Sequence, residues 1–209
     1  MVARAWTRRR TLARHIAARY VRNRILILCE GQATEPNYFR KFPVDIDLVE
    51  LDVRGAGANT LSLVSEAIRL GEKAAKGNRP YNQIWCVLDR DAFPAGNFNA
   101  AFRVAAENRI RIAYSNQCFE LWYFLHYHFN DAGIDRHAYS DKLTGLMGRT
   151  YRKNDDEMYA LLKSRQQTAT QNAKRLLAIY RPCNPESDDP STTVYRLVET
   201  LNEFIPAVE

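Results

Sequence analysis

Long apolar runs are missing from this sequence of 209 residues, and none approaches the roughly 20 residues that a helix needs to cross a bilayer. We therefore expect no membrane span and a cytoplasmic protein. The G-x-x-x-x-G-K-[ST] motif is missing as well, so the chain does not hydrolyse nucleoside triphosphates by the P-loop route. Any dependence on ATP would have to come from a partner protein.

Cysteine is scarce, and the four residues show no C-x-x-C spacing. They mostly lie in apolar segments, a pattern that argues against a disulfide framework or a zinc site and predicts reduced, mostly buried thiols. The composition, with 46% hydrophobic and 26% charged residues, is that of a globular protein. The chain is long enough for one well-buried core and too short for two ordinary domains.

Acidic residues are absent from residues 1–24, which contain eight arginines. The formal net charge of +6 resides in this basic amino-terminal arm, because the rest of the chain carries 22 basic and 24 acidic residues. Such an arm fits contact with a phosphate backbone, from which it would release counterions. Two alternatives stay open: a solvated tail, and a segment that resembles an organelle transit peptide.

Two apolar runs end abruptly in acidic residues. The first, Ile25–Cys29, has the length and composition of a buried parallel strand, and Glu30 and Gly31 follow it. The second, Ile84–Leu88, is followed by Asp89-Arg90-Asp91. Open α/β sheets bind their ligands at the carboxyl ends of the strands. If the two strands are neighbours, these carboxylates meet at one edge of the sheet.

Strand and helix patterns alternate along the first part of the chain. Strands are expected at residues 25–29, 46–53, 83–88 and 110–114, and helices at 34–42, 59–75 and 98–108. This order indicates an α/β fold with a mostly parallel sheet and helices on both faces. Only helical patterns follow, at residues 118–129, 137–146, 155–180 and 192–204, with Ser191 or Thr192 as the cap of the last helix. We therefore expect a core of residues 25–130 and a C-terminal helical extension, residues 131–209, packed on it.

Carboxylates gathered at one edge of a sheet repel one another and raise one another's pKa. A divalent cation removes this penalty, and oxygen ligands with an open coordination sphere suit Mg²⁺ or Mn²⁺. The D-x-D spacing places Asp89 and Asp91 on the same side of an extended segment, where they can share one ion. Glu30 would complete the site, and Gly31 would let the backbone turn and approach a substrate closely.

Three further polar residues have two interpretations each. Glu35 is either a ligand of the same site or an acid at the amino-terminal end of a helix, where it interacts with the helix dipole. Asn116 either contacts phosphate or a metal-bound water, or caps the next helix, and Glu120 is either a further ligand or the first-turn acid of that helix. The apolar segment Leu121–Phe129 predicts that Glu120 is partly buried, which favours a functional role.

The chain contains three motifs in this order: CEGQATEPNYF, WCVLDRD and AYSNQCFELW. Together they resemble the RloB family, which is found beside restriction and abortive-infection genes in prokaryotes and is related to the Toprim fold. The resemblance runs from Ile25 to about Val198. In the wider Toprim superfamily a glutamate ends the first strand and a later strand ends in D-x-D, positions that match Glu30, Asp89 and Asp91. The second acid of the similar nuclease motif usually lies four residues after the first, whereas Glu35 lies five residues after Glu30.

The resemblance and the carboxylates together lead to one main hypothesis: a metal-dependent endonuclease on a Toprim-like sheet, which cleaves RNA or DNA with Mg²⁺ or Mn²⁺ as an effector of anti-phage defence. The expected roles are catalytic for Glu30 and Glu35, metal-binding for Glu30, Asp89, Asp91 and Glu120, and nucleic-acid-binding for Arg90, Asn116 and Lys153. The alternative is a non-catalytic module that binds metal or nucleotide and regulates a defence ATPase encoded nearby. Strand transfer or primer synthesis ranks last, because the partner domains for either are missing. The sequence leaves the oligomeric state open.

Overall fold

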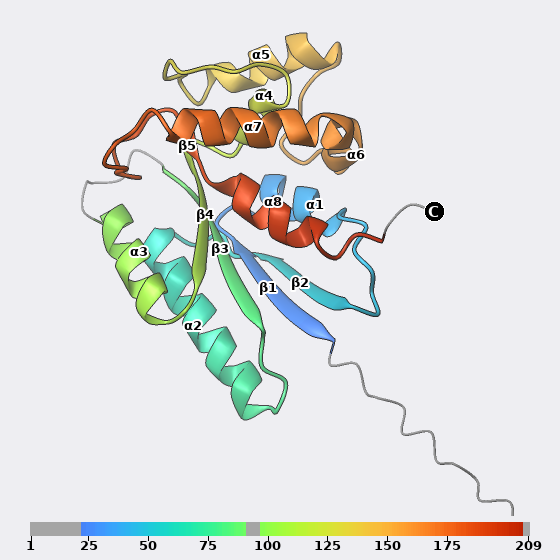
Figure 1. Cartoon of the computed structure of the whole chain (residues 1–209), viewed down its shortest axis with the longest axis vertical. Coiled ribbons are helices and arrows are strands. Elements are labelled where there is room, and N and C mark those ends of the chain that lie inside the picture. Colours follow the sequence, from blue (N-terminus) through green and yellow to red (C-terminus); the bar gives the residue numbers. More distant parts are fainter. Residues whose placement is uncertain (1–21, 91–96, 207–209) are drawn as a thin grey trace, which may run out of the picture.

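A five-stranded sheet lies between two layers of helices in the computed structural model, which describes residues 22–90 and 97–206 (Figure 1). Most of the basic arm and Asp91 are outside the described residues, so the roles assigned to them stay predictions. The strands are β1 (Asn23–Cys29), β2 (Val49–Gly55), β3 (Gln83–Asp89), β4 (Arg111–Asn116) and β5 (Ser191–Thr192).

The sheet has the strand order β2-β1-β3-β4-β5. Strands β1 to β4 are parallel, and only β5 runs antiparallel to its neighbour β4. The predicted α/β class with a mostly parallel sheet is therefore confirmed. Strand β1 lies between its parallel neighbours β2 and β3, which explains why its residues Ile25–Cys29 are all buried and all apolar.

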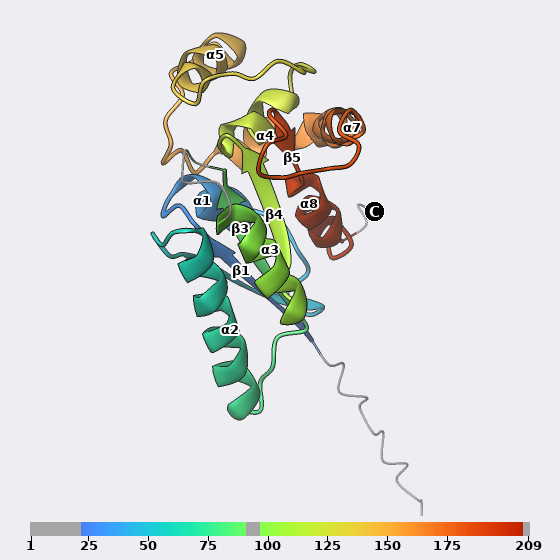
Figure 2. The same cartoon turned by 90° about the vertical axis from the view of Figure 1, so that its left-hand side faces the viewer.

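The two faces of the sheet carry separate hydrophobic cores. Alternate residues of β1, such as Leu26 and Leu28, point to the face covered by α2 (Thr60–Lys76) and α3 (Asn97–Glu107). Their neighbours point to the other face, which is covered by helices from both halves of the chain, among them α1 (Thr34–Arg40) and α8 (Val194–Asn202). Figure 1 shows α2 and α3 on one side of the strands and α1 and α8 on the other, and Figure 2, turned by 90°, is viewed from the side of α2 and α3.

The remaining helices gather beyond the carboxyl end of β4 (Figure 1). They are α4 (Glu120–Leu125), α5 (Ala138–Met147), α6 (Met158–Leu162), the 3₁₀ helix η1 (Lys163–Arg165) and α7 (Gln166–Leu177). The expected continuous helix at 155–180 is wrong, because η1 separates α6 from α7. The two parts pack on different elements, α6 on α1 and α7 on α4, so the helix axis changes direction between them.

Three other predicted boundaries are corrected. The helix expected at 118–129 ends at Leu125, where the N–H groups of His126 and Tyr127 bond three residues back instead of four. The strand expected at 46–53 begins only at Val49, because residues 45–48 form a turn closed on the carbonyl of Asp45. Ser191 and Thr192 form the short strand β5 and Thr193 directly precedes α8, although the Thr192 hydroxyl does accept a hydrogen bond from the N–H of Val194 at 3.2 Å.

The thiols follow the prediction. Cys29, Cys86 and Cys118 are buried, Cys183 is exposed, and none forms a disulfide. Within the described ranges, no helix has the length and apolar character needed to span a membrane.

Candidate active site

Two acidic residues meet where β1 and β3 end. The strands are parallel neighbours, as expected, with Cys29 in register with Val87. The N–H of Glu30 donates to the Val87 carbonyl at 3.0 Å, which continues the ladder by one residue. The N–H of Asp89 in turn donates to Oε2 of Glu30 at 3.4 Å. The sheet register thus holds Glu30 and Asp89 side by side.

Glu35 reaches the same place from the first turn of α1. Its side chain is buried, and its Oε1 accepts a hydrogen bond from the N–H of Gly31 at 3.3 Å. A Cβ at position 31 would collide with the Glu35 carboxylate, so a larger residue there would displace that carboxylate. Glu35 is therefore both a first-turn acid and a group turned back toward the end of β1. The spacing of five residues after Glu30 does not keep it away from the carboxylate pair. The sequence Thr34-Glu35-Pro36 predicts a helix start with threonine as its cap, but Thr34 is itself the first residue of α1, Ala33 precedes it, and no side-chain cap is present.

Glu120 is the first residue of α4 and is 4% exposed, which confirms its predicted burial. Its Oε1 accepts a hydrogen bond from the Tyr151 hydroxyl at 2.9 Å, and the Lys153 ammonium lies 3.8 Å from the same oxygen. Both partners belong to the C-terminal extension. The extension thus supplies a buried hydroxyl and an exposed cation to the site.

These residues line one cavity of about 360 Å³, which we call the acidic pocket. Its charged lining consists of Glu30, Glu35, Asp89, Glu120, Arg136 and Lys153. Four carboxylates from four separate segments thus share a small space with two cations. The sequence patterns did not single out Arg136, which lies in the loop before α5.

Burial and mutual repulsion change the protonation of the pocket. Loss of solvent on burial raises the pKa of Glu30 from 4.5 to about 7. The hydrogen bond from the Asp89 N–H opposes this increase in pKa, and the negative charge of Glu35 adds to it. Burial, followed by the charges of Glu35, Glu120 and Glu30, raises the pKa of Asp89 well above its ordinary value. Burial also raises the pKa of Glu35, and the charge of Glu120 contributes. At neutral pH the pocket therefore favours extra protons or a bound cation.

The donor set suits a hard cation. Oδ1 of Asp89 is buried and has no hydrogen-bond partner among the described residues, so an acceptor is left over inside the pocket. However, within 22–90 and 97–206 no group of three or more histidine, cysteine, aspartate or glutamate side chains is arranged to hold a metal ion. Asp91, the second acid of the D-x-D motif, lies outside these ranges. The Mg²⁺ site therefore stays a prediction.

Arg90 and Asn116 do not line the acidic pocket. The guanidinium of Arg90 donates to the Glu186 carbonyl at 3.0 Å, and the amide of Asn116 donates to the Asp188 carbonyl at 3.0 Å. Asn116 is not a helix cap either, because it ends β4 and Phe119 precedes α4. Both residues line a neighbouring cleft of about 550 Å³, which shares Arg136 with the acidic pocket.

The family model described as RloB-like protein matches residues 25–201 of this chain, most of its length. No curated protein and no solved structure matches the chain.

Proposed function

Because the chain belongs to the RloB-like family and gathers four carboxylates at the ends of parallel strands, we propose that it is a Mg²⁺-dependent nuclease that hydrolyses phosphodiester bonds of RNA or DNA. Its place would be in prokaryotic defence against phage, which fits the family. The observation that carries the proposal is the acidic pocket itself, where Glu30 and Glu35 meet Asp89 and Glu120 from two distant parts of the sequence.

Asp89 is the principal candidate for binding the ion, because its Oδ1 is buried without a partner at the carboxyl end of β3. Asp91 and Glu30 are the neighbours that would share the ion with it. A bound Mg²⁺ or Mn²⁺ would supply Lewis-acid polarisation of a phosphoryl oxygen and neutralise the charge of the cluster.

Glu30 is suited to proton transfer. A carboxyl group with a pKa of about 7 is present in both protonation states at neutral pH, so it can accept a proton from an attacking water and then release it. Glu35 lies within the same pocket and adds to the high pKa of Glu30. Positioned acid–base groups of this kind contribute roughly 10²- to 10⁴-fold to the rate.

Lys153 and Arg136 are the candidates for holding the substrate. Both line the acidic pocket, and the Lys153 side chain is 62% exposed, so its ammonium can contact a phosphate that approaches from solvent. The cleft that holds Arg90 and Asn116 adjoins the pocket at Arg136 and offers room for a nucleotide next to the scissile phosphate.

The test is a cleavage assay with purified protein on plasmid DNA, single-stranded DNA and total RNA, with Mg²⁺, with Mn²⁺ and with a chelator. We expect metal-dependent cleavage of at least one substrate, and a loss of cleavage for Lys153→Ala that Lys153→Arg partly restores. Binding of metal without cleavage of any substrate would contradict the proposal. It would favour instead a regulatory module that acts on a partner ATPase.

A further inference from the structure

Part of the β4 edge of the sheet has no strand partner among residues 22–90 and 97–206. β5 pairs only with Ser115 and Asn116, and the next residue, Thr193, covers Tyr114. The N–H of Thr193 donates to the Tyr114 carbonyl at 2.9 Å, and the Tyr114 N–H donates to the Thr193 hydroxyl at 3.0 Å. In the described parts of the chain, no strand pairs with the outer side of residues 111–113.

The backbone of Ile112 faces this open side. The peptide groups of successive residues in a strand point alternately to the two neighbouring strands. Tyr114 directs both its N–H and its C=O away from β3, toward Thr193. Two residues earlier, Ile112 therefore directs its own N–H and C=O the same way. An exposed pair of this kind is a template for another strand.

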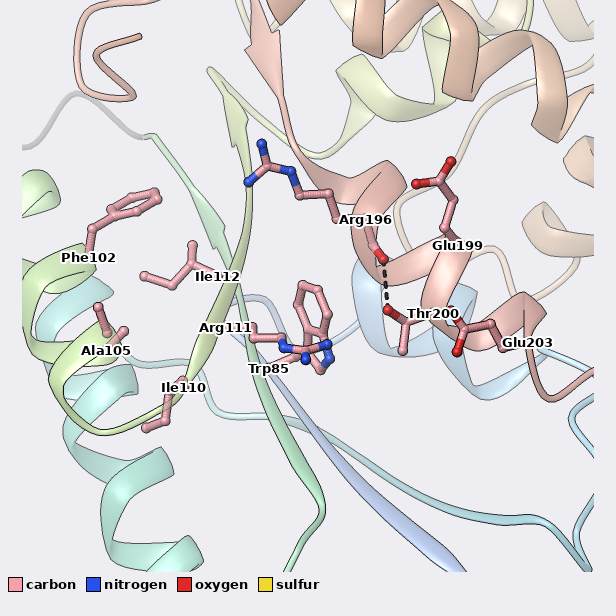
Figure 3. A pocket seen from close by; sticks show the side chains of 11 residues that line it. Trp85, Phe102, Ala105, Ile110, Arg111, Ile112, Arg196, Glu199, Thr200 and Glu203 are labelled. Atoms are coloured by element: carbon pink, nitrogen blue, oxygen red, sulfur yellow. Dashed lines mark hydrogen bonds between the residues drawn. The ribbon is translucent and has the colours of Figure 1, made fainter.

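The open edge lies at the floor of a groove of about 520 Å³ between α3 and α8 (Figure 3). The α3 side is apolar and includes Phe102, whereas α8 lines the other side with exposed charges. The groove is separate from the acidic pocket, because the two share no lining residue.

The exposed charges on α8 are arranged so that they would pair with those of a second α8 that runs in the opposite direction. Arg196 and Glu203 are seven residues apart, about two turns, and therefore lie on the same side of α8. Glu199 points away from Arg196 (Figure 3) and forms an ion pair with Lys174 of α7 at 2.6 Å. If a second α8 ran antiparallel to the first, each Arg196 would face a Glu203 of the other copy. A parallel arrangement would bring like charges together.

We propose that the groove is the contact surface for a second copy of this chain, which adds its β4 antiparallel to the first about a two-fold axis through Ile112. On this axis the two Ile112 residues form a hydrogen-bonded pair and exchange both N–H···O bonds. Arg111 then lies opposite Ala113, so the small alanine leaves room for the guanidinium and two arginines do not face each other. Such a contact is isologous, with the same patch on both copies.

A free peptide strand fits this surface less well than a second copy. Only three residues of the edge are open, so an added strand gains about two backbone hydrogen bonds from them. A stable dimer typically buries about 1,200–2,000 Å², which here requires the flanking helices as well as the strand. A second copy related by two-fold symmetry brings its own α3 and α8 to the contact, and the charges on its α8 have the spacing that matches those on the first.

The arrangement leaves each active site within one chain. Because the two β4 strands run in opposite directions, the carboxyl ends of the two parallel sheets, and with them the acidic pockets, lie at opposite ends of the joined sheet. Dimer formation is thus independent of the proposed nuclease activity, and each can fail without the other.

The test uses the full chain and four variants, with mass measured by sedimentation velocity from about 1 to 100 µM. The variants are Arg196→Glu, Glu203→Arg, the double exchange of both, and Asp47→Arg as a control at an exposed position on the turn before β2. All three exchanged positions are exposed, so the substitutions do not disturb the core. We expect wild type and control to show twice the chain mass of 24.1 kDa.

Each single exchange should weaken the dimer by at least about tenfold, because it places like charges at two symmetric contacts, and the double exchange should restore it. Amide hydrogen exchange at Ile112 should slow as wild-type concentration rises. A wild type that stays monomeric at the highest concentration would overturn the proposal. So would single exchanges that behave like the control, or a double exchange that fails to restore the dimer.

Discussion

Replacement of Glu30 by glutamine should change how stability depends on pH. Burial raises the pKa of Glu30 from 4.5 to about 7. A carboxyl with a raised pKa binds more protons in the folded than in the unfolded state between these two values. The free energy of unfolding therefore falls as pH increases from about 4.5 to about 7. Stability contributed by the protonated group is fully present at the acidic end of this range and lost at the alkaline end.

The size of the effect follows from the shift. At about 1.4 kcal/mol per pKa unit, the difference between 4.5 and about 7 sets an upper limit of about 3.5 kcal/mol. Glu30 is partly exposed, so solvent screening reduces this to on the order of 1–2 kcal/mol. Glutamine keeps the shape of the side chain without the charge, and the variant should gain about this much stability over wild type at pH 8.

Urea denaturation of wild type, Glu30→Gln and the exposed control Glu107→Gln between pH 5 and pH 8 measures the effect. We expect the free energy of unfolding of Glu30→Gln to depend less on pH than that of the other two proteins, which should behave alike. The same pH dependence in all three proteins would refute the view that Glu30 is held in an unfavourable, proton-retaining site. Lower stability of Glu30→Gln than of wild type at pH 8 would refute it as well.

Three further predictions concern two residues of the pocket and the basic amino-terminal arm. Glu35→Gln should lower cleavage in the nuclease assay by at least about a hundredfold, with little change in the melting temperature measured by thermal unfolding. If Glu35 were only a first-turn acid, the substitution would change stability by roughly 0.3–1 kcal/mol and leave cleavage intact. Gly31→Ala should displace the Glu35 carboxylate and lower cleavage similarly, while Gly145→Ala, whose added Cβ meets no atom within 4 Å, should keep wild-type activity in the same assay. Deletion of residues 1–20 should weaken nucleic-acid binding and flatten its dependence on salt concentration, with an unchanged circular dichroism spectrum, and an unchanged salt slope would show that the arm does not bind phosphates.

The ends of β1 and β3 could be predicted because their signal is local. A short apolar run bounded by Glu30 in one case and Asp89 in the other indicates a buried strand and the point where it ends. The parallel order then places both ends at one edge of the sheet, and the register confirms that they are neighbours. Burial of Glu120 was likewise predictable from the apolar segment that follows it.

Other parts of the site depend on long-range packing and have no local signal. Arg136 lies in a loop, and Tyr151 meets Glu120 from 31 residues away because α5 and the following loop fold back over α4. Arg90 follows Asp89 directly, yet its guanidinium lies 5.8 Å from the centre of the Phe98 ring and bonds to the Glu186 carbonyl, away from the acidic pocket. Such contacts are set by the tertiary fold.

Strand β5 shows the limit of pattern analysis for short elements. Two residues, Ser191 and Thr192, are too few to show the alternation of a strand, and both residue types are typical of helix caps. They form a strand because β4 has a free edge beside them, where the Thr192 hydroxyl contacts the Ser115 hydroxyl at 2.9 Å. Their partner, not their own sequence, determines their structure.

The central claim is that the acidic pocket binds a cation and cleaves nucleic acid, and the most direct test is cleavage by Asp89→Asn. Asparagine keeps the size of the side chain but removes the charge that would offset Mg²⁺. We measure single-turnover cleavage by wild type, Asp89→Asn and the exposed control Asp47→Asn across a series of Mg²⁺ concentrations. We expect Asp89→Asn to lose at least about a hundredfold in rate and to regain part of it at high Mg²⁺, while the control cleaves like wild type. Cleavage by Asp89→Asn at the wild-type rate would contradict the account.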